Sequence, residues 1–150
     1  MSDTSAPDGT AFFTPKSLAG HWRARRHIED ARAGGTAYLS GVAVFSQTGP
    51  QDMTYREGGR LFMPNGQVFE ASRTYLWKFP ATSPIQVCFE DGRLFHLLDP
   101  SELGKEITHL CGEDTYRGTI TIDGDQEWTT IWTVKGPRKD QQLTTRYART

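Results

Sequence analysis

Pairs of turn-forming residues divide the chain at short intervals after residue 30, and this spacing restricts the fold more than any other feature of the sequence. The pairs are Gly34-Gly35, Gly49-Pro50, Asn65-Gly66, Asp91-Gly92, Asp99-Pro100, Asp123-Gly124 and Gly136-Pro137. Such pairs are typical of tight turns between strands. The stretches between the turns predict strands at 22–30, 36–46, 52–62, 67–79, 85–90, 93–98, 105–111, 115–122, 126–134 and 141–149.

Ten successive strands with short connections predict an antiparallel meander. A sheet of that length usually curls and closes, which removes its exposed edges. We therefore expect an all-β, up-and-down barrel of about 8–10 strands. A short helical turn precedes it, because Thr14 suits an N-cap and Pro15 suits the first helical position. Residues 1–11, rich in Ser, Asp, Gly and Pro, predict a disordered tail, and residues 12–150 the barrel domain.

The near-neutral charge argues against a general nucleic-acid binder. The 150 residues include 17 basic and 18 acidic side chains, for a formal net charge of −1. The long-range positive field of such a binder is therefore missing. A local basic stretch contains Arg23, Arg25, Arg26 and Arg32. We interpret this stretch as a solvated strand face.

Cysteine content and hydropathy indicate a cytoplasmic protein. Cys88 and Cys111 are too few for a disulfide-stabilised secreted scaffold. Cys88 is predicted to point outward and Cys111 inward, so we expect no disulfide between them. The N-terminus lacks the basic and apolar regions of a signal peptide. No apolar run approaches the roughly 20 residues of a membrane helix. We expect no nucleic-acid or membrane partner, and either a monomer or a homodimer.

Turn lengths predict which side chains face the barrel interior. A two-residue turn at Asp91-Gly92 pairs Phe89 with Leu94 and Val87 with His96, and these four residues share the inward face. The same reasoning at Asn65-Gly66 sets the register of the strand at 67–79, whose inward face includes Arg73 and Tyr75. The preceding strand leaves two alternatives open.

In that preceding strand, Glu57 faces inward if Gly58-Gly59 forms a bulge, and Arg56 faces inward without it. Near the C-terminus, a three-residue turn at 123–125 pairs Tyr116 with Trp132. Keeping Cys111 and Tyr116 both inside requires a change of phase between them, which we expect to be a bulge near Gly112.

The segment Gly20-His21-Trp22 resembles the entry motif of lipocalin-like (calycin) barrels. In that fold the Trp closes the floor of the barrel and an Arg of the last strand packs across the indole ring. The resemblance implies that Trp22 forms the floor and that Arg146 or Arg149 supplies the cation–π contact.

A longer resemblance covers most of residues 18–149. It is to an uncharacterised family of small lipocalin-like proteins of bacteria and fungi. The matching segments are Leu18–Trp22, Tyr55–Gly58, Ala71–Trp77, Phe89–His96, His109–Tyr116 and Gly136–Asp140. This resemblance implies a calycin-type barrel with polar side chains in its cavity. It implies no particular reaction.

Polar side chains on the predicted interior are the main indication of function. They are Arg73, Tyr75, His96, His109, Cys111 and Tyr116, together with Glu57 if the bulge forms. Each unpaired polar group in a sealed core costs roughly 1–3 kcal/mol. One interpretation is therefore a cavity that binds a polar or anionic small molecule, with Arg73 as a fork for carboxylate or phosphate. The other is a buried network, with Arg73 paired to Glu57 or Asp114, that only holds the register.

Three further functions use the same residues. Acid–base catalysis of an isomerase- or cyclase-like reaction would use His109 as base, Tyr116 as acid and Arg73 to stabilise an anion. Haem binding would need one axial histidine, His109 or His96. Zinc would need three or four ligands, and His109 and Cys111 with His96 lack any supporting motif, so we expect no metal site. The sequence identifies no ligand or cofactor.

Overall fold

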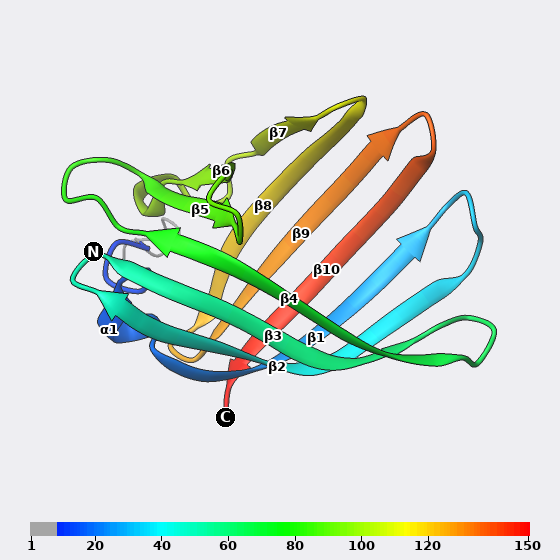
Figure 1. The fold of residues 1–150 in the computed structure, drawn as a ribbon, viewed down its shortest axis with the longest axis horizontal. Helices are drawn as coiled ribbons and strands as arrows, with labels where there is room; N and C mark the ends of the chain where they lie inside the picture. Colours follow the sequence, from blue (N-terminus) through cyan, green and yellow to red (C-terminus); the bar gives the residue numbers. More distant parts are fainter. Residues whose placement is uncertain (1–8) are drawn as a thin grey trace, which may run out of the picture.

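The computed structural model describes residues 9–150 as a curled antiparallel sheet (Figure 1). Within these residues a single α-helix, α1, covers Pro15–Leu18, and a short 3-10 helix, η1, covers Pro100–Glu102. The strands are β1 (Gly20–Asp30), β2 (Thr36–Gly49), β3 (Asp52–Phe62), β4 (Val68–Lys78), β5 (Ile85–Phe89), β6 (Leu94–Leu98), β7 (Ile107–Cys111), β8 (Asp114–Gly124), β9 (Glu127–Gly136) and β10 (Lys139–Arg149). All ten predicted strands are present, which confirms the all-β barrel.

The order of the strands places the first and last strands side by side in the middle of the sheet. Across the sheet the order is β6-β5-β4-β3-β2-β1-β10-β9-β8-β7. The first and last strands pair directly, with Trp22 opposite Arg149. The edge strands β6 and β7 lie next to each other, but no backbone ladder joins them within residues 9–150. The barrel is therefore nearly closed, with one gap between β6 and β7 that we call the seam.

The predicted floor is formed by α1 and the adjoining end of the barrel. The Trp22 ring is buried, and its indole N–H donates to the Leu18 carbonyl at 2.9 Å. The Arg149 guanidinium lies 4.0 Å from the centre of that ring. It also donates to the carbonyls of Ser17 and Ala19. The hydroxyl of Thr14 accepts from the Ser17 amide at 3.1 Å, as expected of an N-cap.

Three hairpins differ in register from the sequence prediction. In the β5–β6 hairpin, Val87 lies opposite His96 as predicted, but an irregularity between Val87 and Cys88 brings Cys88, and not Phe89, opposite Leu94. Leu94 is consequently exposed. In the β8–β9 hairpin an irregularity near Ile122 shifts the pairing by two residues, so inward and outward faces are kept but the predicted partners are wrong.

The β3–β4 hairpin resolves the alternative at Glu57. Residues 64–66 form a three-residue loop, since the Met63 amide donates to the Gln67 carbonyl across it. The sequence predicts a loop of two residues here. The extra residue puts Glu57 opposite Arg73 with no bulge at Gly58-Gly59. Glu57 faces inward because of the loop length, and Arg56 faces outward.

The cysteines are unbridged, as predicted, but their exposure is the reverse of the prediction. Cys88 is buried and Cys111 is exposed. The predicted bulge near Gly112 is absent, because β7 and β8 pair without a register shift as far as Cys111 opposite Asp114. Cys111 therefore lies at the open end of its strand.

Most of the predicted tail, residues 1–8, lies outside the described residues. Residues 9–11 lie in turns, and the Gly9 amide donates to the Pro100 carbonyl at 3.1 Å. None of the helices that residues 9–150 form has the length and apolar character to cross a membrane.

Candidate ligand-binding cavity

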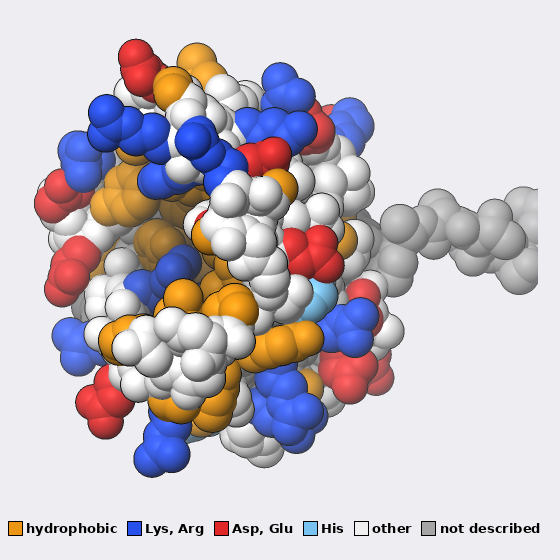
Figure 2. Space-filling model, turned by 90° about the vertical axis from the view of Figure 1, so that its right-hand side faces the viewer, with side chains coloured by type: hydrophobic (Ala, Val, Ile, Leu, Met, Phe, Trp, Pro, Cys, Tyr) orange, Lys and Arg blue, Asp and Glu red, His pale blue; other side chains and the backbone are white. Residues whose placement is uncertain are grey.

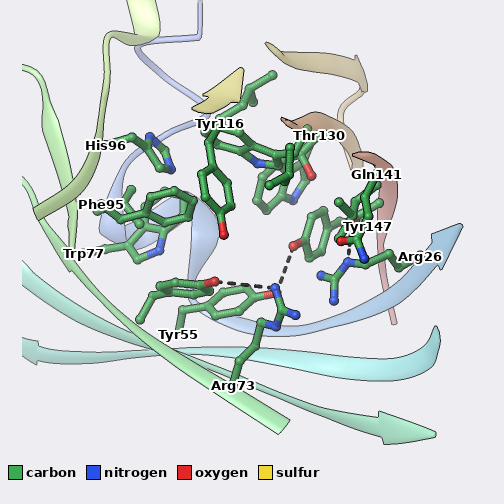
Figure 3. A pocket seen from close by; sticks show the side chains of 18 of the residues that line it. Arg26, Tyr55, Arg73, Trp77, Phe95, His96, Tyr116, Thr130, Gln141 and Tyr147 are labelled. Carbon is green, nitrogen blue, oxygen red and sulfur yellow. Dashed lines mark hydrogen bonds between the residues drawn. The ribbon is translucent and has the colours of Figure 1, made fainter. Parts of the chain in front are cut away.

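The barrel encloses a cavity of about 470 Å³. Figure 2 faces the end of the barrel that carries the β1–β2 and β3–β4 turns, and it shows a hollow with hydrophobic side chains inside. The cavity is lined by Arg26, Tyr55, Ser72, Arg73, Tyr75, Trp77, Val87, Phe95, His96, Tyr116, Ile120, Trp128, Thr130, Trp132, Val134, Gln141, Leu143, Thr145 and Tyr147 (Figure 3). Its volume is within the range typical of small-molecule sites.

One wall of the cavity is a buried hydrogen-bonded network centred on Glu57. Arg26 binds both carboxylate oxygens, at 2.7 and 2.8 Å, and its Nε donates to the Thr145 hydroxyl at 2.7 Å. The Tyr55 hydroxyl donates to Glu57 at 2.5 Å. Because that uses the only Tyr55 hydroxyl hydrogen, the 2.8 Å bond between Tyr55 and Tyr147 is donated by Tyr147. Every member of this network is therefore paired by another.

The network depends on small side chains in β2. This strand lies between β1, which carries Arg26, and β3, which carries Glu57. The inward positions of β2 there include Gly41 and Ala43. A Cβ at Gly41 would lie 2.5 Å from the Gly58 carbonyl oxygen, so only glycine fits. The Arg26 side chain reaches Glu57 from β1 over these positions.

The protonation states of the network follow from its contacts. Burial acts to raise the pKa of Glu57, but the hydrogen bonds and charge of Arg26, with Tyr55 and Arg73, outweigh burial and hold that pKa below its ordinary value. Burial raises the pKa of both Tyr55 and Tyr147. At neutral pH the network is an arginine–carboxylate ion pair with two neutral phenols.

Arg73 leaves the cavity with an excess positive charge. The charged side chains among the lining residues are Arg26 and Arg73, and Glu57 balances one of them. Arg73 Nε lies 3.7 Å from Glu57, and Nη1 donates to the Tyr75 hydroxyl at 3.5 Å, a long hydrogen bond. The Arg73 side chain is 45% exposed. Among residues 9–150, these are its hydrogen-bond and ion-pair contacts, so most of its five N–H donors remain for a ligand.

The opposite wall is aromatic. Phe95 stacks on Trp132, with ring centroids 5.2 Å apart and planes at 26°, and lies near parallel to Tyr75 at 5.8 Å. Tyr116 meets the edge of Phe95 at 5.7 Å. These rings pack on one another, and their cavity-facing surface suits contact with the ring of a planar molecule. The cavity therefore combines a cation on one side with ring surfaces on the other.

His96 is the buried titratable group of the aromatic wall. Its Nδ1 lies 3.1 Å from the Leu97 carbonyl oxygen. Burial lowers the pKa of His96 to about 4; the hydrogen bond to that carbonyl opposes the shift, and the nearby His109 adds to it. His96 is therefore a neutral imidazole at pH 7.

This shift predicts a specific loss of stability in acid. The unfolded chain takes up the His96 proton near pH 6.5, whereas the folded protein takes it up only near pH 4. Stability from this residue is complete above pH 6.5 and falls, by up to about 3 kcal/mol, as the pH drops to 4. Urea unfolding at several pH values should show a steeper decline for wild type than for His96→Phe. Parallel pH profiles would contradict the assigned pKa.

The structure brings together four of the seven predicted ligand contacts. Arg73, Tyr75, His96 and Tyr116 line the cavity, and Glu57 lies behind Arg26 as its ion-pair partner.

His109 lies outside the cavity, in a groove along the seam where its ring is 5.2 Å from Phe95, and burial lowers its pKa. Exposed Cys111 lies beyond it at the strand end. Of the two candidate haem ligands, only His96 thus faces the cavity. Within residues 9–150, no three His, Cys, Asp or Glu side chains are grouped so as to hold a metal ion.

Sequence reasoning missed several lining residues, above all Arg26. The sequence predicts a solvated face for Arg26 and its neighbours, but the Arg26 side chain is 6% exposed and lies inside the barrel. The signal was present: if Trp22 faces inward, strict alternation along β1 places Ala24 and Arg26 inward too. The same alternation from Tyr147 would have found Thr145.

Comparisons with known proteins identify the fold and the family. No curated protein matches the chain. Nineteen chains of solved structures match, and three of them follow. The S-type phycobiliprotein lyase CPES from Guillardia theta has 8% identity over 91% of this chain and 90% of that chain, with a TM-score of 0.66. The redesigned β-barrel mFAP1 bound to DFHBI has 18% identity over 90% and 97%, with a TM-score of 0.49. Rv2717c from M. tuberculosis has 10% identity over 97% and 99%, with a TM-score of 0.45.

At 8% identity, the similarity to CPES shows the fold alone. The family match is more specific, because it extends over residues 18–149 and so over nearly the whole chain. The protein belongs to the Family of unknown function (DUF6314).

Proposed function

We propose that this protein binds a small aromatic anion inside the barrel, with Arg73 as the contact for its negative charge. The observation that carries this proposal is the unbalanced guanidinium at the cavity wall. Arg26 satisfies both oxygens of Glu57, so Arg73 is left 3.7 Å from an acid that is already paired. A carboxylate, sulfonate or phosphate of a ligand would restore neutrality and use the planar donor fork of arginine.

A purely structural network does not account for Arg73. The ion pair, the Thr145 contact and the two tyrosines form a closed set of hydrogen bonds without it. Its side chain is nearly half exposed, so it adds little to stability. The ring surfaces of Phe95 and Trp132, on the same cavity, support an aromatic partner.

Geometry gives less support to acid–base catalysis. That mechanism needs His109, Tyr116 and Arg73 around one substrate, but His109 lines the seam groove and not the cavity. We therefore propose binding without assigning a reaction. We also infer a calycin-type barrel, supported by the stacking of Arg149 on Trp22, and a cytoplasmic location, which suits two unbridged thiols.

A pair of fluorescent probes tests the role of charge. Anilinonaphthalene sulfonate and N-phenyl-1-naphthylamine share one ring system, but only the first carries a sulfonate. Titration of wild type should give the tighter Kd for the sulfonate. Arg73→Gln should weaken sulfonate binding by about 10- to 100-fold, the equivalent of about 1.5–3 kcal/mol for a hydrogen bond to a charged group, and leave the neutral amine unchanged.

Arg117 provides the matched control. It lies on β8 next to Tyr116 but points outward, with a side chain 61% exposed. Arg117→Gln removes the same charge from the protein and should leave both affinities unchanged. Equal loss in the Arg73 and Arg117 variants would mean that only net charge matters. If wild type binds neither probe, the proposed function is wrong.

A further inference from the structure

The tautomer of His96 follows from its contact with the backbone. A carbonyl oxygen accepts hydrogen bonds and cannot donate them, and Nδ1 lies 3.1 Å from the carbonyl oxygen of Leu97. The hydrogen of the neutral ring is therefore on Nδ1. Nε2 carries the lone pair and is a hydrogen-bond acceptor.

This acceptor has no partner in the described part of the protein. Among residues 9–150, the His96 side chain is hydrogen-bonded through Nδ1 and not through Nε2, and the His96 residue is 7% exposed. Figure 3 shows the imidazole among the residues around the cavity, close to Phe95. Nε2 is not itself fully buried, so a molecule in the cavity can reach this unpaired acceptor.

The surroundings of His96 favour an organic donor. The ring contacts Phe95 edge to face at 4.9 Å and Trp132 at 5.1 Å, and both line the same cavity. A metal ion would require further ligands, and no group of three candidate ligand side chains is formed within residues 9–150. A molecule lying against the aromatic wall, by contrast, needs only one O–H or N–H to pair with Nε2.

We propose that the ligand is an aromatic anion that also carries a hydroxyl or N–H group, which donates its hydrogen to Nε2 of His96. This inference rests on the proposed function, because the anionic group of the same molecule is held by Arg73. It adds a second requirement besides negative charge: the aromatic end of the ligand carries a hydrogen-bond donor. A hydroxylated aromatic carboxylate has both features.

Three related acids separate the donor from size and charge. Cinnamate supplies a carboxylate and a ring, 4-hydroxycinnamate adds a hydroxyl donor, and 4-methoxycinnamate adds an oxygen that cannot donate. Their affinities are measured at pH 7 by displacement of anilinonaphthalene sulfonate. Wild type should bind 4-hydroxycinnamate about five- to tenfold more tightly than cinnamate. The methoxy compound should gain nothing.

His96→Phe keeps a flat ring and removes the acceptor. In this variant the preference for the hydroxyl compound should disappear, while cinnamate binds as it does to wild type. Tyr116→Phe is the matched control, since it removes a different group of the cavity wall that could pair with the ligand hydroxyl. If the preference is lost in Tyr116→Phe and kept in His96→Phe, the proposal is wrong.

A measurement on the wild-type protein avoids any effect of substitution on folding. The ¹⁵N chemical shift of the unprotonated Nε2 of His96 should move upfield when 4-hydroxycinnamate binds and stay constant with cinnamate. An unchanged shift at saturation overturns the assignment of His96. Equal affinity of wild type for the three acids overturns only the donor requirement, whereas no binding of the acids or of the sulfonate probe overturns the proposed function too.

Discussion

Arg26→Met should destabilise the barrel by about 3–5 kcal/mol, because it leaves the Glu57 carboxylate buried without its main partner. Arg26 supplies two of the hydrogen bonds to Glu57, at 2.7 and 2.8 Å, and a third to Thr145. Methionine fills similar space but donates nothing. Urea unfolding at pH 7, followed by tryptophan fluorescence, measures the free energy of unfolding.

Two variants identify the cause of that loss. Arg25 precedes Arg26 on β1 and points outward, so Arg25→Met should change stability by no more than about 0.5 kcal/mol. The double variant Arg26→Met/Glu57→Leu removes both charges and should recover much of the lost stability, since an apolar pair replaces the ion pair. If Arg26→Met is no worse than Arg25→Met, the ion pair does not stabilise the fold.

Trp22→Ala should also cost about 3–5 kcal/mol, but for a reason of packing. The Trp22 residue is 1% exposed, and its ring meets Trp128 edge to face at 6.3 Å and Phe12 at 6.0 Å. Its removal opens a void in the floor and leaves the Leu18 carbonyl and the Arg149 guanidinium without the indole. Urea unfolding should show a lower midpoint.

A substitution in the floor should lower stability more than binding, and a substitution in the cavity should do the reverse. Trp22 does not line the cavity, so the folded Trp22→Ala protein should bind anilinonaphthalene sulfonate with an unchanged Kd. Trp132 does line it and is partly exposed. Trp132→Ala should therefore weaken binding more than it lowers stability. Similar effects of the two variants on binding would show that floor and cavity are one unit.

The number of strands could be predicted from the sequence because turn chemistry is local. Each glycine- or proline-containing pair acts on its immediate neighbours, and alternation then gives the inward face of each strand. Exact register was harder. The loop at Asn65-Gly66 includes Pro64 and so has three residues, and that one residue decides whether Glu57 or Arg56 faces inward. Local sequence preference does not fix such a difference.

The site was harder to predict than the fold because its charges depend on distant partners. Arg26 is inside because Glu57, 31 residues away, can pair with it. A rule that puts arginine on the surface fails wherever such a partner exists. Strand alternation predicts an inward position for His109, yet His109 lies beside the seam and outside the cavity. Periodicity within one strand carries no information about where the sheet fails to close.

The seam has a consequence for association between molecules. Its two edges belong to consecutive strands, which residues 99–106 connect, so the unpaired backbone groups of β6 and β7 are kept opposite each other. A single proteolytic cut in that connection would release both edges. Each would then offer free N–H and C=O groups beside an exposed leucine, Leu94 on β6 and Leu110 on β7, which is the template on which strands of separate molecules pair. We therefore expect cleavage of that short connection to promote edge-to-edge aggregation.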